Sequence, residues 1–508
     1  MLKIRFSLAL DGARSTLPAL GPGDVVMGPQ GLLNLLELHL GLQPVIATPA
    51  QRAVDYRLAL TQDLARHPDT FYAASLAVDE LGVAARLLQW RDDWHLHGWQ
   101  GQPGPDWTGR LLDMARVEAL FNGRSAPSVG ERLAAVAQAL EGGAVPVTDL
   151  ACLQPRVSLP RCWQQVLDRL PARYPPPDPA AEGESMLARL QAALLDPSAH
   201  GPIDWSDDGS LTLVESAPGL LAHAWLSARR GDQGDTLLLA EHDAQWLDDG
   251  LRRAGHPAHG LSDASRLRPA LQVLPLALSL LWQPPDIYAV VSFLTHPLCP
   301  IPGFVRMPMA RHIARRPGVE PDQLLRELNS IQAAWQEQHA DEADSGARIQ
   351  NAIGQAQGWL IRDRFAPNEG APIGAVRQVV VDLAEYFRKR SGAAQRDGRE
   401  DTGEGAAHAQ CVALLQSLGQ LLAQGEQALT PRPLQTLVRH ASARGAVPPG
   451  RFPEWGASRV ATSPAQVVEP VDELIWWNLR GAPALPRSVF TRAERQALRD
   501  AGIALPDP

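Results

Sequence analysis

Residues 235–255 read DTLLLAEHDAQWLDDGLRRAG, a short apolar run followed by an amphipathic pattern that stops at a glycine. The run Asp235–Glu241 predicts a buried β-strand, and the spacing from Asp243 to Ala254 predicts a helix. Gly255 suits a helix end, because glycine adopts the left-handed backbone conformation without steric cost. A strand followed by a helix is the repeating unit of parallel sheets, so this segment predicts an α/β fold.

Further strand and helix patterns flank this unit on both sides. Ser128 and Glu131 have the spacing of a capping box, which marks the start of a helix. Residues 267–444 are helical almost throughout by their apolar periodicity. The other strands are predicted at Leu2–Leu10, Val145–Leu153, Leu211–Ser216 and Val467–Leu479, and further helices at Gly28–Leu42, Leu159–Leu170, Ala217–Arg230 and Phe490–Pro506. The pattern is therefore two groups of strand–helix units around a long helical segment.

A chain of 508 residues is long enough for three or four structural units. The proline-rich segment Pro171–Pro179 indicates a linker and places the first boundary near residue 180. The polar, glycine-rich residues 391–408 predict a disordered loop. We expect one unit at 1–180, a second built from 200–266 and 455–508, and a helical insertion at 267–454 that contains this loop.

The composition is that of a globular protein, with 45% hydrophobic and 20% charged residues. No apolar run approaches the roughly 20 residues of a membrane span, and residues 1–10 lack a secretory pattern, so we expect a cytoplasmic protein without membrane contact. The net charge of −9 confines any nucleic-acid contact to a local basic surface. The cysteines lack metal-ligand spacing and are expected to be reduced core thiols; they are Cys152, Cys162, Cys299 and Cys411.

Lysine is nearly absent: Lys3 and Lys389 stand among 47 lysines and arginines. A phosphate-binding P-loop needs a lysine after its glycines, and neither lysine follows a glycine. A PD-(D/E)XK nuclease needs a lysine two residues after an acid, and Phe387 holds that position before Lys389. We therefore assign no catalytic residue, cofactor or metal. The strand, turn and helix around Gly28 have the arrangement of a nucleotide-binding loop without its lysine, and whether this loop holds a nucleotide is left open.

Several segments resemble a known family. Residues 235–301 resemble the strand, helix and start of the helical insertion in the second motor domain of superfamily I helicases. The segments VDELIWWNLRGAPALP (Val471–Pro486) and TRAERQALRDAGIALP (Thr491–Pro506) resemble the late part of AddB-type subunits of bacterial helicase–nucleases. The segment FYAASLAVDELGVAARLLQWRDDWHLHGW (Phe71–Trp99) is similar to a lysine-less group of that family, the inactivated superfamily I helicases with a C-terminal PD-(D/E)XK nuclease.

This resemblance implies a degenerate superfamily I helicase-like fold, with RecA-like α/β domains and a large helical insertion. It also implies a role in DNA double-strand-break end processing and recombinational repair, where a partner subunit supplies the ATP-driven motor. The family's nuclease domain would follow Pro508, so we expect no nuclease activity from these residues. The four cysteines do not have the spacing of the iron–sulfur cluster found in many members.

Two groups of basic residues are candidates for contact with DNA phosphates. The first comprises Arg306, Arg311, His312, Arg315 and Arg316, and the second comprises Arg388, Lys389 and Arg390. On a helix, Arg311 and Arg315 share a face. The alternative is that each group is a solvated face, with the first paired to Glu320, Asp322 and Glu327.

Two adjacent tryptophans, Trp476 and Trp477, lie on the predicted strand Val467–Leu479 and therefore face opposite sides of the sheet. One is expected in the core. The other, for which we take Trp477, either stacks on a DNA base or packs under the helical insertion.

Three functions are consistent with these observations. The first is a non-catalytic helicase-like scaffold that contacts single-stranded DNA or duplex ends together with a helicase–nuclease partner subunit. The second is the N-terminal part of a PD-(D/E)XK exonuclease whose catalytic domain is separate or lost. The third is a protein-interaction platform without DNA binding, which salt-dependent DNA binding would distinguish from the first.

Overall fold

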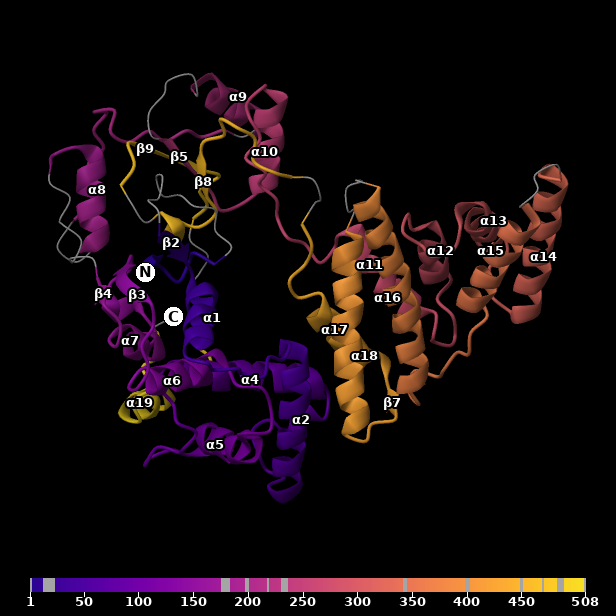
Figure 1. Ribbon diagram of the computed structural model, residues 1–508, viewed down its shortest axis with the longest axis horizontal. Helices are drawn as coiled ribbons and strands as arrows, with labels where there is room; N and C mark the ends of the chain where they lie inside the picture. Colours follow the sequence, from indigo (N-terminus) through magenta and orange to yellow (C-terminus); the bar gives the residue numbers. More distant parts are fainter. Residues whose placement is uncertain are drawn as a thin grey trace.

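The computed structural model describes residues 2–11, 23–174, 183–196, 201–216, 219–229, 236–340, 345–397, 403–447, 451–467, 470–481 and 488–506. In these residues the chain is an α/β protein, mostly helical, with two parallel sheets, and the predicted class is confirmed. Figure 1 shows both sheets on one side of the molecule and the helices of residues 269–441 on the other.

The first sheet has four parallel strands in the order β2-β1-β3-β4. They are β1 (Leu2–Phe6), β2 (Asp24–Met27), β3 (Val147–Cys152) and β4 (Ala172–Arg173), and the core beside them is completed by α1 (Pro29–His39), α6 (Val129–Ala139) and α7 (Arg161–Leu167). The predicted capping box is confirmed at the start of α6, where the Ser128 hydroxyl accepts from the Glu131 N–H and the Glu131 carboxylate accepts from the Ser128 N–H.

A unit of helices, here the N-terminal helical unit, lies next to this sheet (Figure 1). It consists of α2 (Pro49–Arg66), α3 (Ala73–Leu76), α4 (Glu80–Leu96) and α5 (Gly109–Phe121), joined by α19 (Arg492–Asp500). Leu498 and Ile503 are buried beside Trp94 and Trp107, and Arg110 forms an ion pair with Glu494. The prediction grouped residues 455–508 with the second sheet, whereas residues 490–505 pack on the N-terminal helical unit, because α19 offers its apolar side chains to this tryptophan cluster.

The second sheet has three parallel strands in the order β8-β5-β9. They are β5 (Thr236–Ala240), β8 (Arg459–Ala461) and β9 (Glu473–Trp477), with α9 (Gly219–Arg229) and α10 (Ala244–Arg253) packed on one face; α8 (Met186–Leu195) precedes them in the chain. Helix α10 ends as predicted, with Gly255 at a φ of 86°. The chain thus leaves the sheet after β5 and returns to it on both sides of the same strand.

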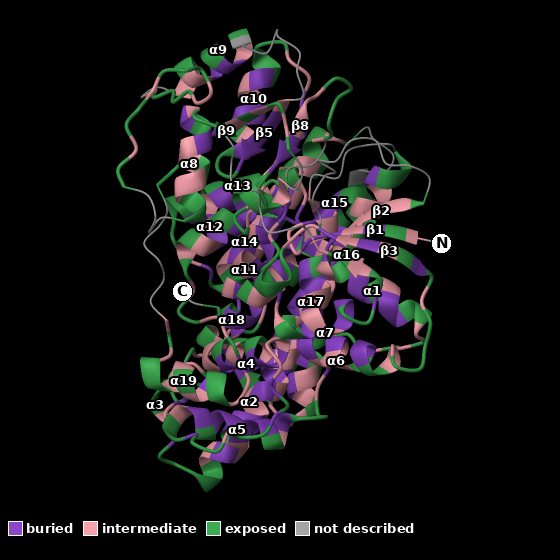
Figure 2. Ribbon diagram, turned by 90° about the vertical axis from the view of Figure 1, so that its left-hand side faces the viewer, coloured by how far each residue is buried: buried purple, intermediate pink, exposed green. Residues whose placement is uncertain are grey.

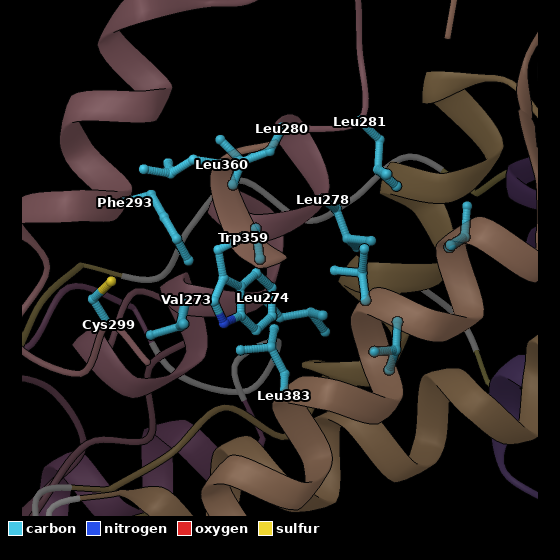
Figure 3. Packing of buried hydrophobic residues seen from close by; sticks show 14 of the residues in the cluster. Val273, Leu274, Leu278, Leu280, Leu281, Phe293, Cys299, Trp359, Leu360 and Leu383 are labelled. Carbon is cyan, nitrogen blue, oxygen red and sulfur yellow. The ribbon is translucent and has the colours of Figure 1, made fainter. Parts of the chain in front are cut away.

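The helical insertion between β5 and β8 has the largest core of the described residues. It consists of α11 (Pro269–Ser279), α12 (Ile287–Thr295), α13 (Gly303–Arg315), α14 (Pro321–Gln338), α15 (Ser345–Leu360), β6 (Ala371–Pro372), α16 (Ile373–Arg396), α17 (Glu404–Ala423), β7 (Ala428–Leu429) and α18 (Pro431–Ala441). Figure 3 shows Trp359 among Leu274, Phe293, Leu360 and Leu383, and the rings of Phe293 and Trp359 are 5.6 Å apart. None of the described helices is long and apolar enough to cross a membrane.

The insertion contacts the N-terminal helical unit through α17 and α18, which pack on α2 and α4. Val54 and Leu81 of that unit belong to the core of the insertion. Polar contacts surround them, because Arg57 pairs with Glu426 at 2.8 Å and Asp55 accepts from Gln424 at 3.2 Å. Figure 2 shows buried residues on the helices that meet here.

Two predicted segments are corrected by the structure. Residues 211–216 form no strand: the side chains of Leu213 and Val214 are exposed, and no neighbouring strand is paired with them among the described residues. The disordered loop at 391–408 is wrong for 391–396 and 404–408, which continue α16 and begin α17; residues 398–402 lie outside the described part. Small apolar residues explain the error, because buried Ala394 and Ala407 give these helices a core-facing side that a polar composition concealed.

Candidate nucleic-acid interface

The first predicted basic group lies on α13, which begins at Gly303 and ends at Arg315. Val305, Met309 and Ile313 are buried and turn the opposite face of the helix outward. On that outer face Arg311 and Arg315 are exposed one turn apart, and Arg316 is exposed directly after the helix. The core packing of α13 therefore positions the arginines as a row on the surface.

The arginines of this row, Arg311, Arg315 and Arg316, have no hydrogen bond or ion pair from their side chains to any described residue. The carboxylates proposed as partners are used elsewhere or lie apart: Glu327 pairs with His312 at 2.9 Å, and Glu320 acts on Arg364. The pairing that the alternative predicts is therefore present for His312 and absent for these three arginines among the described residues. Arg306 differs, because it donates to the Leu294 carbonyl at 2.7 Å and is only partly exposed.

The second predicted group lies near the end of α16, and its three members have different surroundings. Arg390 pairs with Glu404 at 3.1 Å and lies 5.7 Å from the centre of the Tyr386 ring, so it holds α16 to α17. Lys389 makes a long pair of 3.6 Å with Glu385. Arg388 is exposed and has no side-chain partner among the described residues. Only Arg388 is fully free to contact a phosphate.

The two basic groups approach each other at one contact. The Tyr386 hydroxyl donates to the Cys299 carbonyl at 3.3 Å, which links α16 to the turn before α13. Burial raises the pKa of the Cys299 thiol to about 11, and the positive charge of Arg306 acts in the opposite direction. Burial likewise raises the pKa of Tyr386, and the charge of Arg390 opposes it. Arg306 and Arg390 therefore both lie near the Tyr386–Cys299 contact.

The tryptophan pair on β9 faces opposite sides of the sheet, as predicted. Trp477 is only 7% exposed and packs against His223 of α9 and Trp246 of α10, with ring distances of 4.7 and 6.1 Å. Trp476 is 39% exposed on the other face. The assignment of Trp477 to DNA stacking is wrong, because α9 and α10 cover its ring.

The arrangement that suggested a nucleotide loop is present at α1, but a side chain of the protein occupies its anion position. The Asp11 carboxylate accepts from the N–H groups of Gln30 at 2.6 Å and Gly31 at 3.3 Å. Gly28 is required here, since a Cβ on it would lie 2.1 Å from the Asp11 nitrogen. The helix N-terminus that would face a phosphate is thus bound to an internal carboxylate.

The second sheet shows a similar arrangement at the carboxyl ends of its strands, where α/β proteins bind ligands. Asp243 follows β5 and Asn478 follows β9, and both have left-handed φ values of 53° and 49°. The Asn478 amide donates to the Asp243 carboxylate at 2.7 Å, and Arg480 pairs with the same carboxylate. Periodicity gave no signal for this group, because Asp243 lies 235 positions from Asn478 and 237 positions from Arg480.

A third charged group, also missed from the sequence, lies inside the N-terminal helical unit. Arg91 is 1% exposed, and its guanidinium donates twice to Glu118, at 2.7 and 2.8 Å, and twice to Glu131, at 2.8 and 2.7 Å. His95 lies 3.2 Å from Glu118. His95, Glu118 and Glu131 have donor atoms close enough for a metal, but the guanidinium already supplies the positive charge between the carboxylates.

The pKa values in this cluster follow from those contacts. Burial opposes ionisation of Glu131, but the bonds and charge of Arg91 outweigh it and lower the pKa of that carboxyl to about 2. Burial also opposes ionisation of Glu118, and Arg91 and His95 together lower its pKa below the ordinary value. Both carboxylates are therefore ionised at neutral pH and serve to join α4, α5 and α6.

The cysteines are four free, buried thiols, as predicted. Burial raises the pKa of all four above the ordinary value, which removes the thiolate needed for nucleophilic chemistry.

No protein-family model matches the chain, and the search of curated proteins gave no significant match.

Proposed function

We propose that the chain is a non-catalytic scaffold that contacts DNA and partner subunits, and that it resembles the AddB-type subunit of a complex for DNA double-strand-break end processing and recombinational repair. In this proposal the two parallel sheets are degenerate RecA-like domains of a superfamily I helicase-like fold. The partner would be a helicase–nuclease subunit that supplies the motor.

One observation carries the proposal: the chain leaves the second parallel sheet after β5, builds a long helical insertion, and returns to both neighbours of β5. This nesting is the arrangement that the resemblance to superfamily I helicases implies. The absence of a P-loop lysine and the carboxylate of Asp11 at the α1 N-terminus support a silent rather than an ATP-driven unit.

Contact with DNA is supported by the arginine row on α13. Arg311 and Arg315 are exposed, lie on one helix face and lack an internal carboxylate, so their charge is available to phosphates. Phosphate contacts carry no base information, so this surface would bind without sequence preference.

A double charge reversal, Arg311→Glu with Arg315→Glu, tests this proposal by fluorescence anisotropy on a blunt duplex across a salt series. Each lost phosphate contact lowers the steepness of log K against log salt by about 0.9, so the double variant should lower it by roughly 2 and bind more weakly. The matched control is Arg66→Glu with Arg124→Glu, which makes the same charge change on exposed residues of the N-terminal helical unit. If both double variants lose the same DNA affinity, net charge alone explains the loss. That result would contradict a specific DNA-binding surface on α13.

A second candidate function, a protein-interaction platform, is favoured by the outer face of α9. Leu221, Ala224, Trp225 and Ala228 are exposed at helical spacing, which makes an apolar stripe on the surface. A chain that binds no DNA even at low salt would favour this function over DNA contact.

A further inference from the structure

Two chain segments connect the second sheet to the helical insertion, and we call them the neck: residues 256–268, and residues 444–447 with 451–457. Figure 1 shows them between α10 and α11 and between α18 and β8. They run side by side, because Ser265 and Ala446 exchange two backbone hydrogen bonds of 2.9 and 3.0 Å. Further along, the Glu454 N–H donates to the Ala258 carbonyl at 2.7 Å.

The neck is firmly attached to α10. Arg451 pairs with Asp249 at 2.7 Å, and the Asp248 carboxylate accepts from the N–H groups of His259 at 2.6 Å and Leu261 at 3.1 Å. Gly260 lies so close to the opposite segment that a Cβ would be 2.5 Å from the carbonyl carbon of Phe452. These contacts hold the backbone of the neck against α10.

On this fixed backbone two aromatic side chains face solvent. Phe452 is 75% exposed and Trp455 is fully exposed. Neither ring packs on another aromatic or cationic side chain of the described residues. Two aromatic rings exposed on one held segment are available to stack with a flat ligand.

The neck that carries these rings is also rich in arginine. The described residues of the neck contain four arginines, Arg266, Arg268, Arg444 and Arg451, against two acids, Asp263 and Glu454. Arg451 and Arg268 serve the structure, since Arg268 donates to the Ala446 carbonyl at 3.2 Å. Arg266 and Arg444 are exposed and have no carboxylate partner among the described residues.

Helix α18 adds to this positive surface beside the neck. Arg439 is exposed, and its side chain donates only to the Thr436 hydroxyl at 2.8 Å. Burial lowers the pKa of His440, and the charges of Arg439 and Arg266 lower it further while Asp79 opposes them. Arg439 lies in the last turn of α18, which ends at Ala441 just before the neck residue Arg444.

We propose that the neck is a single-stranded DNA platform, on which Phe452 and Trp455 stack with bases while Arg266, Arg444 and Arg439 contact the phosphates. Exposed aromatic rings beside a cationic surface are the features that bind single strands without sequence preference. Ala258, which pairs with Glu454 next to Trp455, and Arg266 are joined by a segment that spans at most about 30 Å. A short oligonucleotide can cover that distance. Two isolated rings do not make the continuous apolar core that a protein interface needs. The inference rests on the proposed DNA contact for its ligand class, but on a different surface.

The test measures the dissociation constants of a fluorescent oligothymidylate and a blunt duplex for the wild type, Trp455→Ala and Phe452→Ala. Loss of one stacked base should weaken single-strand binding about 5- to 150-fold, whereas the duplex, whose bases are already stacked, should bind nearly as before. Trp455→Phe should retain most of the single-strand affinity. Trp205→Ala, at an exposed tryptophan outside the neck, is the matched control and should change nothing. Since Trp455 makes no buried contact, the thermal melting of its variants should match the wild type.

If the double variant Trp455→Ala with Phe452→Ala binds the single strand as tightly as the wild type does, the platform is overturned. The rings would then be assigned to a protein partner. Equal weakening of single strand and duplex would also overturn it, because stacking requires unpaired bases. The two proposals can fail separately. If the neck variants lose single-strand binding and the α13 charge reversal has no effect, the platform is retained and the α13 surface is rejected. Duplex binding without single-strand binding in the wild type would reject the platform and retain DNA contact, and no binding of either DNA would reject both.

Discussion

Helices α2, α4 and α5 of the N-terminal helical unit use arginine differently from helix α13 of the helical insertion. In the first, Arg52 pairs with Asp92, Arg91 with Glu118, and each guanidinium donates two hydrogen bonds to its carboxylate. In the second, Arg311 and Arg315 project from α13, and neither has a carboxylate partner among the described residues. Removal of one member of a buried ion pair leaves the other charge buried without a partner, which destabilises the fold. An exposed arginine contributes little to stability. The comparison separates charges that hold the fold from charges that are available to a ligand.

The largest effect is expected from Arg91→Met. Removal of the guanidinium leaves Glu118 buried without its counter-charge, which should lower the free energy of unfolding by about 3–5 kcal/mol. Urea denaturation measures the loss. Arg311→Met is the matched change on the insertion and should stay within about 0.5 kcal/mol of wild type. Similar losses in the two variants would remove the distinction between the regions.

The pH dependence of stability sharpens the same comparison. The folded-state pKa of Glu131 is about 2 against an ordinary value of 4.5, so its contribution is complete above about pH 4.5 and is lost as the pH falls toward 2. Glu131→Gln retains an acceptor for the capping box but has no charge. Its deficit against wild type should therefore be greatest near neutral pH, about 1.5–3 kcal/mol, and shrink in acid. A deficit that is constant with pH would contradict the ionised pair.

A smaller difference is expected between two glycines at the start of α1. Gly28→Ala would place a Cβ 2.1 Å from the Asp11 backbone and should cost about 1–3 kcal/mol. Gly31→Ala meets nothing nearer than 3.6 Å within the helix and should stabilise by up to about 1 kcal/mol. Thermal melting of both variants decides the matter. Equal tolerance would show that Asp11 is not held against the helix N-terminus.

Local patterns in the sequence predict much of this architecture. The strand and helix at 235–255, the glycine after α10 and the capping box at Ser128 and Glu131 are all determined by residues close together in the chain. The same periodicity fails at 211–216, where an apolar run finds no neighbouring strand to pair with. Period alone cannot supply the partner that a strand requires.

The candidate site was predicted less completely, for a physical reason. The arginines of α13 were found because a helix brings residues four apart to one face. The partners of Asp11, Asp243 and Arg91 lie far away in the chain, so nothing local showed that these charges are already paired. Trp477 was misassigned because the sequence gives the two faces of β9 but not which of them α9 and α10 cover.

We propose that exposed arginines of the insertion bind DNA, while the Asp11 carboxylate occupies the position that a nucleotide phosphate would take. The most direct measurement is the binding of the chain to single-stranded and blunt duplex DNA across a salt series, with and without ATP and Mg²⁺. We predict binding that weakens steeply with salt and is unchanged by ATP. No binding at low salt, or binding that depends on ATP, would contradict the account.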